Sequence, residues 1–221
     1  MKSISAKIYK APKTPAPELA IRRLLVYLDY LKGINADCVS SSQIADAFGF
    51  TAIQVRKDIA HTGFTGRPKH GYNRAELIKH IEGFLGFNDK MNALLVGAGN
   101  IGRALASYSG FARYSLKIVA ICDSNPHLHN MEIGGKKICS PQAALDLIKK
   151  LKIKMAIIAV PAEASQNIAD MLVGAGIKAI WNFSSARLSC PADVIVQNED
   201  LGASLSVLSQ KLLAAETARP K

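Results

Sequence analysis

The chain has 221 residues, of which 49% are hydrophobic and 20% charged, so it can bury one large core or two smaller ones. It has no run of about eighteen uninterrupted apolar residues, so we expect no membrane-spanning helix. The formal net charge of +11 favours a polyanionic partner such as nucleic acid. Because the basic residues are spread over both halves of the chain, total charge alone does not locate a DNA-binding surface.

The four cysteines, Cys38, Cys122, Cys139 and Cys190, lie far apart and form no C-x-x-C pair. This spacing argues against a zinc site and against a disulfide framework, so we expect free thiols and no bound metal. Free thiols are typical of a reducing compartment, most simply the cytoplasm.

The N-terminal part of the chain has a helical pattern. Residues 1–16 are basic and lack the apolar core of a signal peptide, so we expect a loose basic arm. From Pro17, which suits a first helical turn, leucines recur at helical spacing as far as Gly33, which suits a helix C-cap. The helical character continues to about Phe87.

Two short helices joined by a tight turn follow within this part. Residues 40–42 begin a helix that Gly49 closes, and Thr51 and Gln54 fit the capping box that starts the next helix. Such a pair predicts a helix-turn-helix.

The second helix of this pair has an apolar and a polar face. Ala52, Val55 and Ile59 share one face at helical spacing, so we expect them to pack inward. The opposite face carries polar side chains that can reach base edges, and a flanking arginine suits a phosphate. From the helix-turn-helix, the residues expected to contact DNA are Ser41, Gln54, Arg56, Lys57 and His61.

The segment 63–73 has glycines near both ends and basic residues between them. This pattern predicts a β-hairpin wing whose basic tip lies along a DNA backbone or enters a minor groove. Alone, a short helix pair or a basic glycine loop is common in proteins that bind no DNA, but together and in this order they favour a winged helix. The wing residues expected at DNA are Arg67, Lys69, His70, Gly71 and Tyr72.

After Asn88 the pattern changes to short β-rich runs, at 92–96, 117–122, 155–160 and 178–182, separated by helix-length segments. Such alternation predicts a parallel sheet covered by helices on both faces. We therefore expect a winged-helix domain over residues 1–88, an α/β Rossmann domain over residues 89–198, and an amphipathic helix with a tail over residues 199–221.

A glycine-rich loop follows the first of these strands. Gly97 permits a tight turn, Gly99 lets a pyrophosphate approach the backbone, and Gly102 lets the following helix pack closely. The free N–H groups at the start of that helix can bind the anion. The expected dinucleotide-binding residues of this loop are Gly97, Ala98, Gly99, Asn100, Ile101 and Gly102.

Asp123 ends the second strand about 20 residues beyond Gly102, the spacing expected for a carboxylate on the adenine ribose. A carboxylate there repels the extra phosphate of NADP and favours NAD(H); alternatively, Asp123 only starts an Asp-Ser-Asn-Pro turn. The two later strands end where ligands bind in this fold. They add Val160, Pro161, Asn182 and Phe183 as candidates to line the nicotinamide half.

Together these residues resemble the Rex family of redox-sensing repressors, from about Pro17 to Leu213. The resemblance is carried by residues 54–58, Gly63-x-x-Gly66, Gly71-Tyr72, residues 97–102, 158–162, Asn182-Phe183 and Asp200-Leu201. It departs at His61-Thr62, where the family usually has an aromatic pair, and at Lys69-His70, where it often has Gly-Tyr.

The resemblance implies a homodimer that binds a palindromic operator through its winged helices and senses NADH and NAD in its Rossmann domain. It also implies that the C-terminal helix is exchanged between protomers and that Tyr108 lies near the nicotinamide. Asp200 is implied to switch partners between Tyr108 and Arg23, with NADH releasing the DNA.

Two other functions fit parts of the sequence. One is an NAD-dependent oxidoreductase, but too few residues follow Asn182 for a substrate domain, and no paired acid and base is evident. We therefore expect no enzyme activity. The other is a DNA-binding regulator that senses a different nucleotide ligand, such as a coenzyme A derivative.

Overall fold

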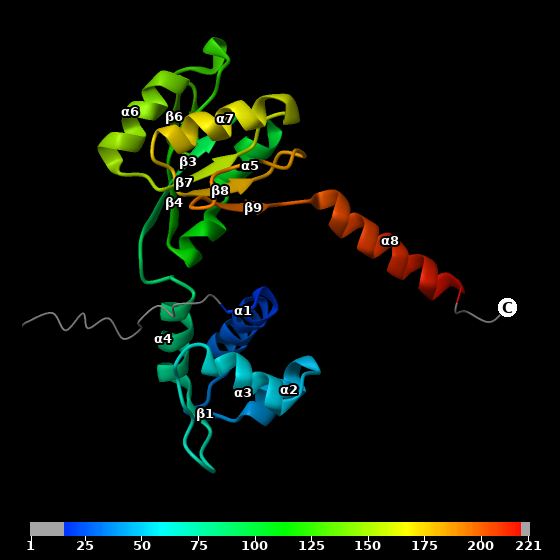
Figure 1. Cartoon of the computed structure of the whole chain (residues 1–221). Coiled ribbons are helices and arrows are strands. Elements are labelled where there is room, and N and C mark those ends of the chain that lie inside the picture. The colour runs from blue at the N-terminus through cyan, green and yellow to red at the C-terminus, as the bar shows by residue number, and fades with distance from the viewer. Residues whose placement is uncertain (1–15, 218–221) are drawn as a thin grey trace, which may run out of the picture. The chain divides into compact units, whose positions relative to one another are not determined.

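The computed structural model describes residues 16–217, so almost all of the predicted basic arm lies outside the described residues. Contacts between residues divide the chain into two compact units, Met1–Asp89 and Lys90–Lys221 (Figure 1). Within the described residues, no helix is both long and apolar enough to cross a membrane.

The first unit is a small helical domain with one short sheet. Its elements are α1 (Glu18–Gly33), β1 (Cys38–Val39), α2 (Ser41–Phe48), α3 (Ala52–Ala60), β2 (Tyr72–Asn73) and α4 (Arg74–Phe84). Side chains from all four helices form a single core, in which Leu24, Ile44, Val55 and Leu77 are fully buried.

Helix caps explain why α2 and α3 start where they do. The Ser40 side chain accepts a hydrogen bond from the Gln43 backbone N–H, and the Gln43 side chain accepts one from the Ser40 backbone, a complete capping box. At α3 the Thr51 hydroxyl accepts from the Gln54 N–H as predicted. The reciprocal half of that predicted box is absent, because the Gln54 side chain turns instead to Asp58.

The wing is less regular than the predicted hairpin. The two arms of segment 63–73 are paired with each other only by an isolated antiparallel bridge between Arg67 and Gly71. The last two residues of the segment form β2, which pairs with β1, Val39 opposite Tyr72. Gly71, at φ 75°, lies so close to the Val39 carbonyl that an added Cβ would meet its oxygen at 2.5 Å. The β1–β2 pairing therefore requires glycine at this position.

The second unit is built on a seven-stranded sheet in the order β5-β6-β4-β3-β7-β8-β9. Its strands are β3 (Met91–Val96), β4 (Leu116–Cys122), β5 (Glu132–Ile133), β6 (Lys136–Cys139), β7 (Met155–Ile158), β8 (Ala179–Asn182) and β9 (Ile195–Asn198). All pairings are parallel except that of β5 with β6, so the all-parallel expectation fails at that edge. The sequence pattern missed β5, β6 and β9, which are short or exposed.

Helices cover both faces of this sheet, as predicted. The helices are α5 (Asn100–Ser107), α6 (Pro141–Leu151) and α7 (Ala162–Gly174), with a 3-10 helix η1 (Ser109–Tyr114) after α5. Helices α6 and α7 pack on one face around Ala156 and Ile158, while α5 and η1 pack on the other around Leu95 and Ile157. Alternate residues of each strand thus supply the two cores.

The predicted C-terminal helix is present as α8 (Leu201–Thr217). The Asp200 side chain accepts a hydrogen bond from the Ala203 N–H and caps it. Five large apolar side chains along α8 are more than half exposed: Leu205, Val207, Leu208, Leu212 and Leu213.

Candidate DNA-binding and nucleotide-binding sites

The exposed surface of α3 differs from the one that apolar spacing predicts. Arg56, Lys57 and His61 are exposed as expected. Gln54 is only half-exposed, and its amide Nε2 donates a 3.1 Å hydrogen bond to Asp58 Oδ1. Gln54 therefore lies at the edge of the open face, with its amide turned toward the buried Asp58 carboxylate, and its contact with a base stays a prediction.

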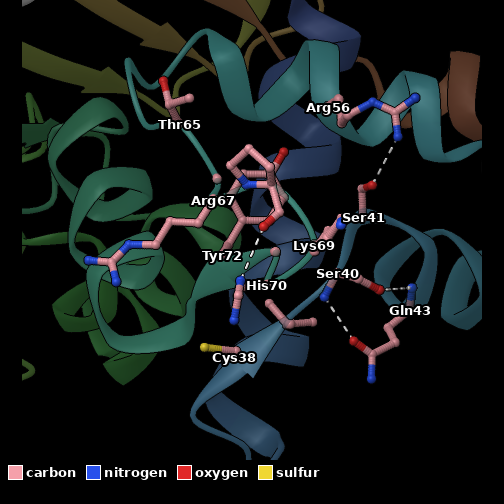
Figure 2. Close-up of a pocket in the computed structure, with 14 residues that line it drawn as sticks. Cys38, Ser40, Ser41, Gln43, Arg56, Thr65, Arg67, Lys69, His70 and Tyr72 are labelled. Carbon is pink, nitrogen blue, oxygen red and sulfur yellow. Dashed lines mark hydrogen bonds between the residues drawn. The ribbon is translucent and has the colours of Figure 1, made fainter.

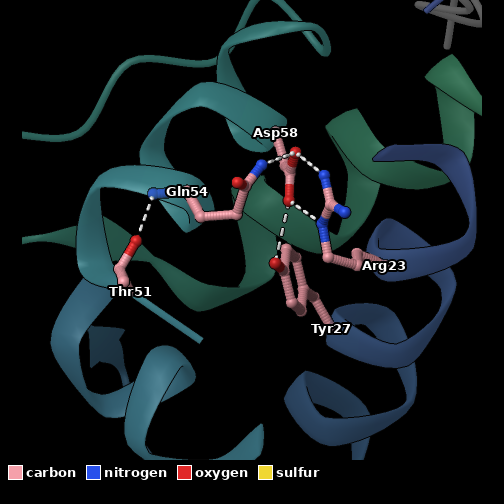
Figure 3. A network of polar contacts seen from close by, with 5 residues as sticks. All are labelled: Arg23, Tyr27, Thr51, Gln54 and Asp58. Atoms are coloured by element: carbon pink, nitrogen blue, oxygen red, sulfur yellow. Dashed lines mark hydrogen bonds and ion pairs between the residues drawn. The ribbon is translucent and has the colours of Figure 1, made fainter. Parts of the chain in front are cut away.

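Asp58 is the centre of a buried polar network between α3 and α1 (Figure 3). Arg23 donates from Nε and Nη2 to the two carboxylate oxygens, at 2.7 and 2.8 Å, and the Tyr27 hydroxyl donates at 2.9 Å. The Asp58 side chain is 1% exposed and that of Arg23 21% exposed. A bidentate arginine pair of this kind fixes both distance and orientation, so it clamps the recognition helix to α1.

The network also sets the ionisation of its members. Burial raises the pKa of Asp58, but the hydrogen bonds from Arg23, Tyr27 and Gln54 outweigh it and leave that pKa below its usual value. Burial, followed by the bond to Asp58, raises the pKa of Tyr27. Asp58 is therefore a carboxylate and Tyr27 a neutral donor at neutral pH.

A hollow of about 620 Å³ lies between the wing and the start of α2 (Figure 2). Its lining includes the predicted DNA-contacting residues Ser41, Arg56, Arg67, Lys69, His70, Gly71 and Tyr72. Arg56 Nη1 donates to the Ser41 hydroxyl at 3.2 Å, which brings two of the predicted DNA-contacting residues together. Lys57 and His61 do not line this hollow.

Two of the departures from the family pattern have different structural roles. Thr62 is 1% exposed, and its hydroxyl donates to the Ile59 carbonyl at 2.6 Å, so it ends α3 rather than facing solvent. Lys69 has φ 64°, in the left-handed region that favours glycine. The turn of the wing therefore carries a lysine at a position where the backbone conformation favours glycine.

In the second unit the strand order reverses direction at the neighbours β3 and β7. Ligands of such sheets bind in the crevice outside the carboxyl ends of the strands at this reversal. A cavity of about 400 Å³ lies there, lined by the predicted Gly97, Gly99, Asp123, Val160 and Pro161. A neighbouring hollow of about 460 Å³ adds the predicted Asn100, Ile101 and Phe183. Most of the predicted cofactor residues thus meet at one place.

The glycine loop has the geometry that an anionic ligand needs. Gly97 has φ 100°, and an added Cβ would collide with the carbonyl of Ala159, the residue directly after β7. A Cβ on Gly102 would strike the carbonyl oxygen of Gly97, whereas one on Gly99 meets nothing within 4 Å. No side chain caps the start of α5, so its first N–H groups remain available to a phosphate. The loop therefore fits a pyrophosphate.

The sequence left two roles open for Asp123, a contact with the adenine ribose and the start of a turn, and its position is compatible with both. Its Oδ1 accepts from the Asn125 N–H at 2.8 Å, as the start of a turn. Its Oδ2 accepts from the Ala98 N–H at 2.7 Å, which ties the glycine loop to the end of β4. Since the residue also lines the cavity, the same bonds that hold the turn place the carboxylate at the cavity wall.

Asn182 and Tyr108 line neither hollow. Asn182 is fully buried, and its amide Nδ2 donates to the Ala186 carbonyl at 2.8 Å and to Asn198 Oδ1 at 2.9 Å. The side chain thus joins the ends of β8 and β9 instead of facing a ligand. Tyr108 is 57% exposed and packs edge-on against Phe111, with ring centroids 4.9 Å apart.

The sequence pattern missed several residues that shape these sites. Asp58 and Tyr27 were passed over because apolar periodicity does not register a buried polar side chain. On the nucleotide side, Asn167, Ile168 and Met171 of α7 line the cavity. The sequence did carry a signal for Asp58, because this aspartate directly precedes the inward-facing Ile59 and so lies on the side of α3 that packs against the core.

All four cysteines are free thiols. Burial, with the neighbouring Cys139 and Asp123, raises the pKa of Cys122 to about 12. In residues 16–217, no three His, Cys, Asp or Glu side chains gather as a metal site.

Two family models match the chain. One described as "CoA binding domain" matches residues 88–186, and one described as "Putative DNA-binding protein N-terminus" matches residues 16–60. The second match lies within the first compact unit, and the first begins at residue 88, close to the division between the two units.

Curated proteins named Redox-sensing transcriptional repressor Rex are similar over most of the chain. The protein from Porphyromonas gingivalis is 37% identical over 202 residues, covering 90% of this chain and 93% of that protein. The protein from Treponema denticola is 39% identical over 202 residues, covering 90% and 94%.

Solved structures of similar sequence cover most of this chain as well. The crystal structure of RSP with β-NAD+ and operator DNA has a TM-score of 0.87 at 36% identity, covering 93% of this chain and 96% of that one. The crystal structure of RSP with β-NADH has a TM-score of 0.81 at 36% identity, covering 93% and 98%. RSP is described as a Rex-family repressor. With a DNA-binding domain followed by a Rossmann-like domain, as predicted, this chain belongs to the Rex family of redox-sensing transcriptional repressors.

Proposed function

We propose that this chain is a repressor that binds a palindromic operator as a homodimer and is released from it by NADH. The observation that carries the proposal is a dinucleotide crevice at Gly97–Gly102 in a chain whose other unit exposes a recognition helix. RSP, at 36% identity, has been crystallised with operator DNA and β-NAD+, and separately with β-NADH. Such a DNA-binding protein acts in the cytoplasm, and we expect it to catalyse no reaction.

The exposed apolar side chains of α8 support the homodimer. An isolated helix that keeps several leucines in water gains little from packing, and stability of such helices normally comes from burial of the apolar side. Insertion of α8 into a second copy would bury Leu205, Leu208 and Leu212. In a symmetric pair, each copy both gives and receives this helix.

Residues at DNA follow from exposure and charge. Recognition helix α3 supplies Lys57 and His61, while Ser41, Arg56, Arg67, Lys69 and His70 meet the sugar-phosphate backbone. Gly71 and Tyr72 hold the wing against β1 and contribute indirectly. In a dimer the two recognition helices must lie about 34 Å apart to fit a palindrome.

NADH and NAD differ by a hydride and by the charge of the nicotinamide ring, so a sensor needs groups that distinguish the two. Tyr108 and Asp200 are exposed and serve this purpose in our proposal. A ligand can shift the DNA-binding equilibrium only by its difference in affinity for the two states.

The predicted exchange of Asp200 between Tyr108 and Arg23 stays a prediction, and the Asp58 network constrains its form. Removing one partner from a buried ion pair costs about 3–5 kcal/mol. Allosteric coupling is typically about 1–3 kcal/mol. Asp200 would therefore have to bind Arg23 while Asp58 still holds it. The part-exposed guanidinium, with five N–H donors and two bonds to Asp58, has the capacity to do so.

A different ligand is the second candidate, because the model that matches residues 88–186 is described as a CoA binding domain. The cavity at β3 and β7 would accept the nucleotide part of either molecule. Calorimetric competition between NADH and coenzyme A for the pure protein decides between them.

The test of the proposal is a gel-shift series on a labelled palindromic duplex with increasing NADH or NAD. We expect NADH to lower the affinity for DNA and NAD to leave it high. Unchanged affinity across the NADH series would show that this nucleotide is not the signal. Turnover assays with common hydroxy acids and aldehydes, followed at the NADH absorbance, should show no reaction.

A further inference from the structure

The centre of the open face of α3 is occupied by an apolar side chain. Ile53, in the first turn of the helix, is 59% exposed. At about 100° per residue, Lys57 and Arg56 lie about 40° and 60° to either side of it. Residues at the N-terminal end of a recognition helix are the ones that reach base edges.

Gln54 is turned away from this centre. Its Nε2 donates to Asp58, which is buried against Arg23 and Tyr27 of α1. A glutamine that reads adenine presents Oε1 and Nε2 together in one plane toward the base. Because one N–H of Gln54 is bound to Asp58 on the protein side, that paired geometry is compromised.

Arg56 is likewise drawn to one side, since its Nη1 donates to the Ser41 hydroxyl at the start of α2. This leaves Ile53 and Lys57 facing outward nearest the middle of the helix. In the major groove only thymine presents a methyl group, and apolar side chains recognise it by contact. An isoleucine kept in water at this position matches that methyl.

We propose that Ile53 is a specificity-determining residue that contacts a thymine methyl group, and that Gln54 is a positioning residue held by the Asp58 network. The clamp formed by Arg23, Tyr27 and Asp58 turns α3 so that Ile53 faces the groove. The inference rests on the DNA binding proposed above and adds which side chain reads which base.

The test starts from a duplex that the full-length protein itself selects from a randomised palindromic library. Each thymine is then replaced in both half-sites by deoxyuridine, which removes only the methyl group. Affinities of the wild type and of Ile53→Ala are measured for every duplex. Thermal unfolding of the variant checks that it folds as the wild type does.

We expect deoxyuridine at one position to weaken wild-type binding about four-fold, the change that corresponds to burying one methyl-sized group, about 0.8 kcal/mol. Ile53→Ala should bind the thymine duplex more weakly and be insensitive to deoxyuridine at that position alone. Equal losses for Ile53→Ala on all duplexes, or no loss at all, would overturn the assignment. Leu19→Ala, which removes another exposed apolar side chain of the same unit, is the control and should keep the wild-type response.

Gln54→Ala gives a second, independent readout. A positioning role predicts weaker binding to every duplex by a similar factor, with base preferences unchanged. Relaxed preference at a single adenine would show instead that Gln54 reads that base directly. If the library yields no selected duplex, the proposal of DNA binding fails; if selection succeeds and no methyl dependence appears, only the role of Ile53 fails.

Discussion

The two units hold their sites by different means. In the first, a side-chain network around the buried carboxylate of Asp58 fixes the recognition helix on α1. In the second, backbone geometry holds the glycine loop: Gly97 and Gly102 approach carbonyl groups too closely for any side chain. The DNA-binding unit should therefore be most sensitive to a change of charge, and the nucleotide-binding unit to added volume.

The largest expected effect is that of Asp58→Asn. Loss of the carboxylate leaves Arg23 without its ion partner, so we expect the first unit to lose about 3–5 kcal/mol of unfolding free energy. DNA binding should fall with it, while NADH affinity measured by calorimetry should stay within two-fold or so of wild type. Asp46→Asn, at an exposed position of α2, is the matched control. A parallel loss of NADH affinity would contradict the separation of the two units.

Gly102→Ala and Gly99→Ala should separate loop geometry from ligand space. In Gly102→Ala the added Cβ strikes the Gly97 carbonyl, so we expect about 1–3 kcal/mol of destabilisation together with lost NADH binding. In Gly99→Ala the Cβ meets no protein atom within 4 Å, so stability should persist while NADH affinity falls at least about ten-fold.

Unfolding curves and calorimetry on the same samples measure both effects. The control is Gly174→Ala near the end of α7, where a Cβ also has open space but lies outside the residues that line the crevice. Equal NADH affinity of Gly99→Ala and wild type would remove Gly99 from the site.

Lys69→Gly should change stability and DNA affinity in opposite directions. Relief of the left-handed backbone at φ 64° is worth about 1 kcal/mol, so the unfolding temperature should rise. Loss of one phosphate contact should weaken DNA binding on all sequences and reduce the salt slope of the affinity by about one. An unchanged salt slope would place Lys69 away from the DNA backbone.

The smallest expected effect is the change, on acidification, in the unfolding free energy that Asp58 contributes. Because the folded pKa of Asp58 lies below its ordinary value of 3.8, its stabilising contribution is complete above that value and is lost as pH falls below it. The difference in unfolding free energy between wild type and Asp58→Asn should be constant from pH 7 to about 5. It should narrow below pH 3.8, as urea unfolding at a series of pH values can show. A difference that widens on acidification would contradict the lowered pKa.

Much of the fold could be predicted because it depends on local patterns. The strand before Gly97, the helix after it and the caps at Ser40 and Thr51 are encoded within a few residues of where they occur. The edge strands β5 and β9, and β6 beside β5, were not among the predicted β-rich runs. β5 has only two residues, β6 begins with two lysines and β9 ends in Gln197 and Asn198, so none has the apolar run by which β7 and β8 were found.

What the sequence determined by itself is therefore the order of parts: a helix-turn-helix with a basic wing, then a strand, a glycine loop and a helix with Asp123 at the required spacing. Tertiary structure alone decided that Gln54 turns inward, since the buried Asp58 carboxylate to which it donates is held by Arg23 and Tyr27, 35 and 31 positions away. It likewise decided that Asn182 joins two strands instead of facing a ligand. Apolar periodicity reports burial driven by the hydrophobic effect, whereas a buried charge depends on partners distant in the sequence.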